Sequence, residues 1–275
     1  MYRFLAPKRL DEAQTYLAEC QNLKILAGGT DLIPLLRSGD VVCDYVMDLK
    51  QIPGLTEIRM TEDGLEVGAA ASLNALLTSG FCEGWYRALG DSARVLANSL
   101  LRNRATLAGN ICHASPGGDM LPSVLVLDAR VETITPAGGR TIPLKGFFTG
   151  VKQHILAPDE MVIKTVFPKE AGASAYRKKK RIHGHDLAQV SVAGSYHADG
   201  TLKLAFGAAG PTPILLDLGI HAPAALGTGR AAILDQAFGS IQPISDIRAS
   251  KEHRLEMAAH LAGEVLDALL ENREV

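Results

Sequence analysis

Two segments rich in small residues constrain this chain more than any other feature. Residues 24–36 read KILAGGTDLIPLL and residues 102–128 read RNRATLAGNICHASPGGDMLPSVLVLD. In each, a turn of small residues is followed by an acidic residue and an apolar stretch that contains proline. The turn is expected at residues 27–30 in the first segment and at residues 108–110 through 116–118 in the second. Small residues let backbone N–H groups approach a ligand closely, as the many acceptor oxygens of a diphosphate require. With helices expected to begin near Thr30 and Asp119, the pattern predicts two turns that share one diphosphate.

The same residues carry a resemblance to a known family. Residues 27–32 (AGGTDL), residues 106–110 (TLAGN) and residues 114–119 (ASPGGD) resemble the FAD-binding medium subunit of the molybdenum hydroxylases, which include xanthine and carbon monoxide dehydrogenases. Residues 159–161, 178–190 and 245–250 are similar to the family more weakly. Two such motifs, separated along the chain as they are in the family, indicate the family far more specifically than one motif does. The resemblance covers nearly the whole chain.

This resemblance implies an α+β fold. A two-lobed α/β FAD-binding domain of the PCMH type would span residues 1–171, with lobes of about 1–55 and 56–171. A smaller α+β domain, similar to the C-terminal domain of carbon monoxide dehydrogenase flavoproteins, would span residues 172–275 and contain an antiparallel sheet and terminal helices. The length of 275 residues independently favours two or three compact units. FAD would then lie between the lobes, with the C-terminal domain covering its ring.

The resemblance also implies a set of cofactor-binding residues. Asp119 would bind ribose or a water that bridges phosphates, and Leu96 and Ala97 would pack on the isoalloxazine ring. Lys178 would lie near the flavin pyrimidine, where a cation stabilises the anionic reduced ring, and Leu187 would lie near the flavin face. The expected set is Ile25, Leu26, Ala27, Gly28, Gly29, Thr30, Asp31, Leu32, Leu96, Ala97, Thr106, Ala108, Gly109, Asn110, Ala114, Ser115, Asp119, Val162, Lys178 and Leu187.

Two positions depart from the family pattern. Ala108 stands where the second segment usually has glycine, and Ala105 replaces another frequent glycine. Both side chains are small, so close approach of the backbone to a ligand is preserved unless either position needs a positive φ.

Electron relay is the function that the resemblance implies. A molybdopterin subunit would oxidise the substrate, an iron–sulfur subunit with [2Fe-2S] centres would conduct electrons, and the FAD of this chain would pass them to NAD or another acceptor. We expect no catalytic residue and no metal on this chain itself. Two alternatives remain open: a stand-alone FAD oxidoreductase of the wider family, and a non-catalytic nucleotide-binding or assembly protein that has lost its flavin.

Composition restricts the class of protein further. The four cysteines are far apart and form no CxxC, which argues against an iron–sulfur or zinc site here. A net charge of −2 gives no reason to expect nucleic-acid binding. Without an apolar run long enough for a membrane span, a cytoplasmic location is expected. Residues 183–186 (HGHD) suggest a metal site, but they lack the further acid and histidine of a dinuclear centre. Residues 178–181 (KKKR) also fit a solvated strand end.

Local patterns predict several elements between these motifs. Residues 85–101 are expected to form one helix, and hairpins are expected around residues 136–139 and 199–200. Residues 170–174 (EAGAS) read as a linker between domains. Ser72 and Ser250 can each cap a helix, and apolar residues at helical spacing predict a long terminal helix after Ser250.

Overall fold

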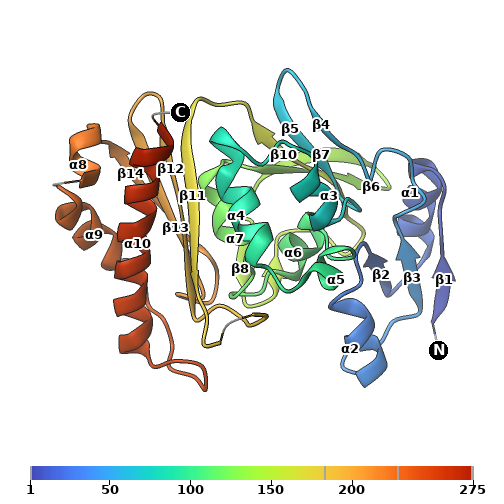
Figure 1. The fold of residues 1–275 in the computed structure, drawn as a ribbon. Coiled ribbons are helices and arrows are strands. Elements are labelled where there is room, and N and C mark those ends of the chain that lie inside the picture. The colour runs from blue at the N-terminus through green and yellow to red at the C-terminus, as the bar shows by residue number, and fades with distance from the viewer. Residues whose placement is uncertain (1, 183, 228, 274–275) are drawn as a thin grey trace.

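A computed structural model describes residues 2–182, 184–227 and 229–273. Its helices and strands are mixed along the chain (Figure 1), which confirms the predicted α+β class. The predicted division at residue 171 stays a prediction, as do the lobe boundaries. Within the described ranges, no helix is long and apolar enough to cross a membrane.

The first sheet is small and parallel. Its strands β1 (Arg3–Leu5), β3 (Tyr45–Asp48) and β2 (Leu23–Leu26) lie in that order. Helix α1 (Leu10–Glu19) connects β1 to β2 and buries Ala13 and Leu17. Strand β2 leads directly into the first small-residue segment, and helix α2 (Leu32–Ser38) follows it. The parallel arrangement therefore places this segment at the carboxyl end of the sheet.

The second sheet is antiparallel, with its strands in the order β4, β5, β10, β6, β7. Strands β6 and β7 form the hairpin predicted around residues 136–139. The strands are β4 (Ile58–Met60), β5 (Gly64–Gly68), β6 (Arg130–Thr135), β7 (Gly138–Pro143) and β10 (Met161–Pro168). A two-stranded ribbon of β8 (Phe148–Gly150) and β9 (Gln153–His154) precedes β10.

The third sheet contains β11 (Gly172–Lys179), β12 (Val190–His197), β13 (Thr201–Gly207) and β14 (Ile214–Ile220), all antiparallel and in chain order. The hairpin predicted around residues 199–200 joins β12 to β13. Helix α10 (Lys251–Arg273) packs on β11 and β12, and α8 (Pro223–Gly227) and α9 (Arg230–Phe238) pack beside it (Figure 1). Ser250 Oγ accepts a hydrogen bond from the N–H of His253 at 3.2 Å, which confirms the predicted cap.

Short helices fill the space between the second and third sheets. Helices α4 (Arg87–Val95) and α7 (Leu121–Val126) pack on the third sheet (Figure 1). Ser72 caps α3 (Leu73–Thr78), as predicted, by accepting a hydrogen bond from the N–H of Ala75 at 3.1 Å. The remaining helices are α5 (Ser99–Arg102) and α6 (Leu107–His113).

The prediction of one helix over residues 85–101 is wrong. The segment divides into a 3₁₀ turn, η1 (Gly84–Tyr86), then α4 and α5, with residues 96–98 as a break. Ala97 takes a positive φ of 49° there, and the Arg102 guanidinium donates to the carbonyl oxygens of Arg94 and Leu96. These side-chain bonds satisfy carbonyl groups that a continuous helix would have used internally.

The prediction of a linker at residues 170–174 is also partly wrong, because β11 begins at Gly172. Ser174 is fully buried; its Oγ donates to the carbonyl oxygen of Trp85 at 2.5 Å and accepts from the N–H of Ala88 at 2.9 Å. Small polar residues suit an exposed linker, but they also suit a strand that packs closely against a helix. Tertiary packing decided between the two here.

Candidate cofactor cavity

A cavity of about 900 Å³ lies where both small-residue segments meet the third sheet's loops. Its walls also include residues 152–162 before and within β10, and Leu187 and Arg248 from the C-terminal part of the chain. The predicted cofactor-binding residues that line it are Ile25, Ala27, Gly28, Gly29, Thr30, Asp31, Leu32, Leu96, Ala97, Thr106, Ala108, Gly109, Asn110, Ser115, Asp119, Val162 and Leu187. Chain segments distant in sequence therefore converge on one space.

The first segment presents a row of backbone donors to this cavity. Among the described residues, the N–H groups of Gly28, Gly29, Thr30 and Asp31 donate no hydrogen bond. Gly29 has a φ of 76°, which favours glycine. A Cβ atom on Gly28 would lie 2.2 Å from the Arg104 carbonyl oxygen. Glycine is thus required at position 28 because the two segments pack against each other, whatever ligand they hold.

The second segment differs from the predicted turn. Residues 108–110 are not a turn but lie within α6, and Thr106 Oγ1 caps this helix by accepting from the N–H of Gly109 at 2.9 Å. Burial of Leu107 and Ile111, both 0% exposed, outweighs the weak helix propensity of Gly109 and Asn110. In the described ranges, the N–H groups of Ser115, Gly117 and Asp119 after α6 donate no hydrogen bond.

The two alanines that depart from the family pattern fit their positions. Ala108 lies inside α6, and neither Ala108 nor Ala105 is among the described residues with a positive φ. Ala108 is 4% exposed, so its methyl group faces packed atoms more than open space. Neither replacement therefore introduces backbone strain at the wall of the cavity.

An ion pair lies beneath one wall of the cavity. Lys178 Nζ is 2.7 Å from Asp119 Oδ2, and the side chains are 2% and 8% exposed. Lys178 also donates to the carbonyl oxygen of Val95 at 3.5 Å, and the Tyr176 hydroxyl donates to Asp119 Oδ1 at 3.4 Å. Burial raises the pKa of Asp119, and the Lys178 ammonium acts against that rise. Asp119 lines the cavity, whereas Lys178 lies behind it.

Three predicted residues lie outside the lining. Leu26 is buried with Cys43 and Val46, and the Ala114 carbonyl oxygen accepts from the N–H of Lys152 at 3.0 Å, at a backbone φ of 47°. Lys178 is the third. Their assignment to cofactor binding stays a prediction, as does that of the whole set.

Several charged and polar lining residues were not among the predicted cofactor-binding residues. Lys24, Lys152, His154 and Glu160 line the cavity. Nothing in the local sequence distinguishes Lys152 or His154 from ordinary surface residues, whereas Lys24 begins the first small-residue segment and Glu160 belongs to residues 159–161, which are weakly similar to the family. Arg248 belongs to residues 245–250, which are weakly similar to the family but were given no role.

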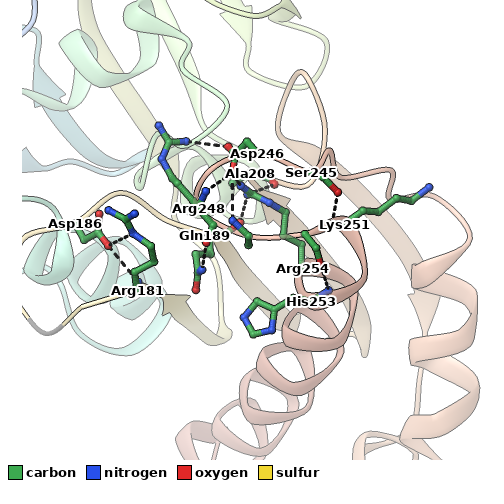
Figure 2. Close-up of polar contacts among 12 residues, drawn as sticks. Arg181, Asp186, Gln189, Ala208, Ser245, Asp246, Arg248, Lys251, His253 and Arg254 are labelled. Atoms are coloured by element: carbon green, nitrogen blue, oxygen red, sulfur yellow. Dashed lines mark hydrogen bonds and ion pairs between the residues drawn. The ribbon is translucent and has the colours of Figure 1, made fainter.

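The C-terminal wall is held by a polar network (Figure 2). The Arg181 side chain lies 3.7 Å from Asp186, and Asp186 Oδ2 also accepts from the N–H of Arg181 at 3.1 Å. The Gln189 side-chain amide donates to the Arg248 carbonyl oxygen at 2.5 Å. Leu187, which lies between these contacts in sequence, is 50% exposed. The loops that border the cavity on this side are therefore fixed by hydrogen bonds.

Possible metal ligands and thiols are dispersed among the described residues. No group of three or more His, Cys, Asp or Glu side chains gathers there in a way that could hold a metal ion, while His183 of the HGHD segment lies outside them. Burial raises the pKa of Cys112, a lining residue, to about 12, so its thiol stays protonated near neutral pH.

The chemistry of the walls suits a diphosphate-containing ligand of dinucleotide size. The backbone N–H groups of both segments that donate no hydrogen bond suit the acceptor oxygens of a diphosphate, and the apolar residues Leu96, Leu187 and Val162 suit a flat ring system. The volume of about 900 Å³ lies in the range of small-molecule sites. FAD fits these requirements.

Comparisons with known proteins agree with this geometry. The family model described as FAD binding domain in molybdopterin dehydrogenase matches residues 1–170. The chain is 32% identical over 269 residues to the putative xanthine dehydrogenase FAD-binding subunit of Escherichia coli, covering 94% of this chain and 92% of that protein. It is 27% identical to the carbon monoxide dehydrogenase medium chain of Hydrogenophaga pseudoflava, covering 97% and 96%. A solved structure of carbon monoxide dehydrogenase from the same organism gives a TM-score of 0.88 at 27% identity and covers 98% of both chains.

Proposed function

Because this chain belongs to the family of FAD binding domains in molybdopterin dehydrogenases, we propose that it relays electrons from [2Fe-2S] centres of a partner subunit, through FAD, to NAD or another acceptor. Family membership identifies it as the flavoprotein subunit of an oxidoreductase and FAD as its cofactor. The partner subunits, an iron–sulfur subunit and a molybdopterin subunit, and the acceptor belong to the proposal.

The observation that carries the proposal is the convergence of two sets of unpaired backbone donors on one cavity. The N–H groups of Gly28 to Asp31 and those of Ser115, Gly117 and Asp119 would hold the diphosphate. Leu96 and Ala97 on one side and Leu187 on the other would bind the ring and exclude water from it. FAD, when bound, exchanges single electrons with iron–sulfur centres and a hydride with nicotinamide, which suits a relay.

The proposed division of labour among subunits agrees with what the described residues hold. They contain no cluster of three potential metal ligands, and their cysteines are free and scattered. We assign substrate oxidation and electron conduction to the partners and the flavin site to this chain. The relative from Hydrogenophaga pseudoflava is named a medium chain, which supports a place in a complex with other chains.

The test begins with the isolated chain. After reconstitution, heat denaturation should release FAD and not FMN, because a monophosphate needs one donor segment and this cavity has two. Elemental analysis should find neither stoichiometric iron nor molybdenum, and the chain should at most oxidise NADH slowly with a dye as acceptor. Hydroxylation of an aldehyde or N-heterocycle by the isolated chain would overturn the division of labour. Mass spectrometry of the natively purified complex should identify the two partners.

A further inference from the structure

Charge is distributed unevenly around the cavity. Three lining carboxylates have a basic partner that lies outside the lining: Asp119 pairs with Lys178 at 2.7 Å, Glu160 with Arg140 at 2.6 Å, and Asp186 with Arg181 at 3.7 Å. The lining also contains Lys24, Lys152 and Arg248. In the described part of the chain, neither lysine has an ion pair. A fourth lining carboxylate, Asp31, lies 3.6 Å from the lining residue His113. One carboxylate cannot neutralise three cationic side chains, so the cavity keeps positive charge.

Arg248 differs from the two lysines because its backbone is fixed. Its N–H donates to Asp246 Oδ1 at 2.8 Å, and its carbonyl oxygen accepts from the Gln189 amide at 2.5 Å. Arg254, 3% exposed, donates from Nη2 to Asp246 Oδ1 at 2.7 Å and from Nη1 to the Gln189 carbonyl oxygen. Figure 2 shows these contacts joining the loop to the start of α10. These contacts therefore fix the backbone of the loop that carries the Arg248 side chain.

The guanidinium itself is largely unused. Within the described residues, the side chain of Arg248 makes one contact, from Nη1 to Asp246 Oδ2 at 3.4 Å (Figure 2). Burial acts to raise the pKa of Asp246, but hydrogen bonds from the N–H of Arg248 and from the Arg254 guanidinium lower it overall. The Asp246 carboxylate is therefore bound mainly to these two groups and not to the Arg248 guanidinium. A guanidinium has five N–H donors in a planar fork that matches the oxygens of a phosphate. At 37% exposure, most of that fork remains available to a ligand.

We propose that Arg248 is a phosphate-binding residue of the cavity, held by the Asp246, Gln189 and Arg254 network and directed at a dinucleotide. The inference rests on the proposed function in that a dinucleotide occupies the cavity. The phosphate belongs either to the cofactor or to a pyridine dinucleotide acceptor, and both offer the same oxygens to the guanidinium. Arginine suits this role better than lysine because two parallel hydrogen bonds fix the orientation of the phosphate.

The experiment compares Arg248→Gln and Arg248→Lys with a matched control, Arg230→Gln. Arg230 lies on α9, pairs with Asp267 at 3.1 Å and is not a lining residue. Apo protein of each variant is titrated with FAD and, separately, with ADP as a flavin-free probe. We expect Arg248→Gln to weaken binding of one or both about 10- to 100-fold, Arg248→Lys to recover part of the loss, and Arg230→Gln to change neither. Urea unfolding of the apo variants should match the wild type, since the side chain makes one weak contact.

A second arm identifies the source of the phosphate. FAD-loaded variants are reduced with NADH and, in parallel, reoxidised with an uncharged quinone. If FAD affinity is unchanged but the KM for NADH rises about 10-fold or more without a change for the quinone, the phosphate belongs to the pyridine dinucleotide. Unchanged affinity for FAD and ADP together with an unchanged KM for NADH overturns the inference. If the wild type takes up no flavin but binds ADP, and this binding depends on Arg248, the proposed function is refuted and the inference stands.

Discussion

Lys178 Nζ lies 2.7 Å from Asp119 Oδ2, and both side chains are nearly excluded from solvent. The family resemblance gave both residues roles at the cofactor, but only Asp119 lines the cavity. Lys178 is positioned to hold the Asp119 carboxylate and to compensate its charge. Its electrostatic influence on a bound ring would be reduced by the paired carboxylate, because the two opposite charges are adjacent.

The pair can be tested by a double-mutant cycle. Lys178→Met leaves an unpaired carboxylate in a buried position and should lower the free energy of unfolding by about 3–5 kcal/mol. Replacing both residues, as Lys178→Met with Asp119→Leu, should cost less than the sum of the single changes. Urea unfolding of the apo variants at neutral pH measures each value. Additive effects, or single changes that cost less than about 1 kcal/mol, would show that the pair is effectively solvated.

Asp119 itself should contribute to cofactor affinity. Asp119→Asn removes a charged acceptor at the wall and should weaken FAD binding by about 1.5–3 kcal/mol, or roughly 10- to 150-fold. Asp91→Asn is the matched control, because Asp91 pairs with Arg94 at 3.0 Å on α4 and is not a lining residue. Fluorescence titration of apo protein with FAD gives both constants. A folded Asp119→Asn variant with wild-type affinity would remove Asp119 from the binding set.

Two glycines of the cavity wall should respond differently to alanine. A Cβ atom at Gly28 would meet the Arg104 carbonyl oxygen at 2.2 Å, whereas one at Gly117 would meet nothing within 4 Å. Gly28→Ala should therefore lower apo stability by about 1–3 kcal/mol and reduce FAD uptake, since the two segments must separate. Gly117→Ala should leave apo stability unchanged or raise it by about 0.4–1 kcal/mol. Thermal unfolding of the two apo proteins distinguishes them, and equal stabilities would refute the packing role of Gly28.

Sequence reasoning predicted those parts of the fold that depend on local signals. Ser72 and Ser250 cap helices as expected, and both predicted hairpins are present, because capping and turn formation depend on a few neighbouring residues. Most of the predicted cofactor-binding residues line the cavity, although they make up less than half of its lining and their role in binding stays a prediction. A resemblance carried by two motifs far apart in the sequence indicates which distant segments lie close together. Secondary-structure propensity does not contain that information.

Tertiary packing explains where the sequence reasoning failed. Residues 108–110 look like a turn, yet burial of Leu107 and Ile111 keeps them helical. Residues 85–101 look like one helix, yet Arg102 bonds to carbonyl groups in the break between α4 and α5. Arg248 could not be placed at the cavity from its own neighbours, because Gln189 and Arg254 hold its loop from other parts of the chain. The loop of Arg248 is held by a residue far away in sequence, whereas Arg102 lies only six and eight residues from the carbonyl groups that it bonds.

The last prediction concerns pH and depends on Glu160, whose side chain is 1% exposed beside the cavity. Hydrogen bonds from the Arg140 guanidinium at 2.7 and 2.6 Å, from the Thr133 hydroxyl and from the N–H of Ala157 hold the pKa of Glu160 at about 2. A carboxyl group whose pKa is lower in the folded state stabilises the fold above its unfolded pKa. That stabilisation is lost as the pH falls toward the folded pKa.

The pH range over which this stabilisation is lost therefore runs from about 4.5, the ordinary pKa of a glutamate side chain, down to about 2, the pKa of Glu160 in the folded protein. The stabilisation lost across it is at most about 3.4 kcal/mol, at 1.36 kcal/mol per pKa unit. We expect the free energy of unfolding of Glu160→Gln to fall less steeply than that of the wild type in urea titrations across this window. The two values should converge near its acid end. Glu62→Gln, at an exposed position with no ion pair among the described residues, should follow the wild type. Parallel curves for the wild type and Glu160→Gln would mean that the Arg140 contact does not depress this pKa, because a group without a shift contributes nothing to the slope.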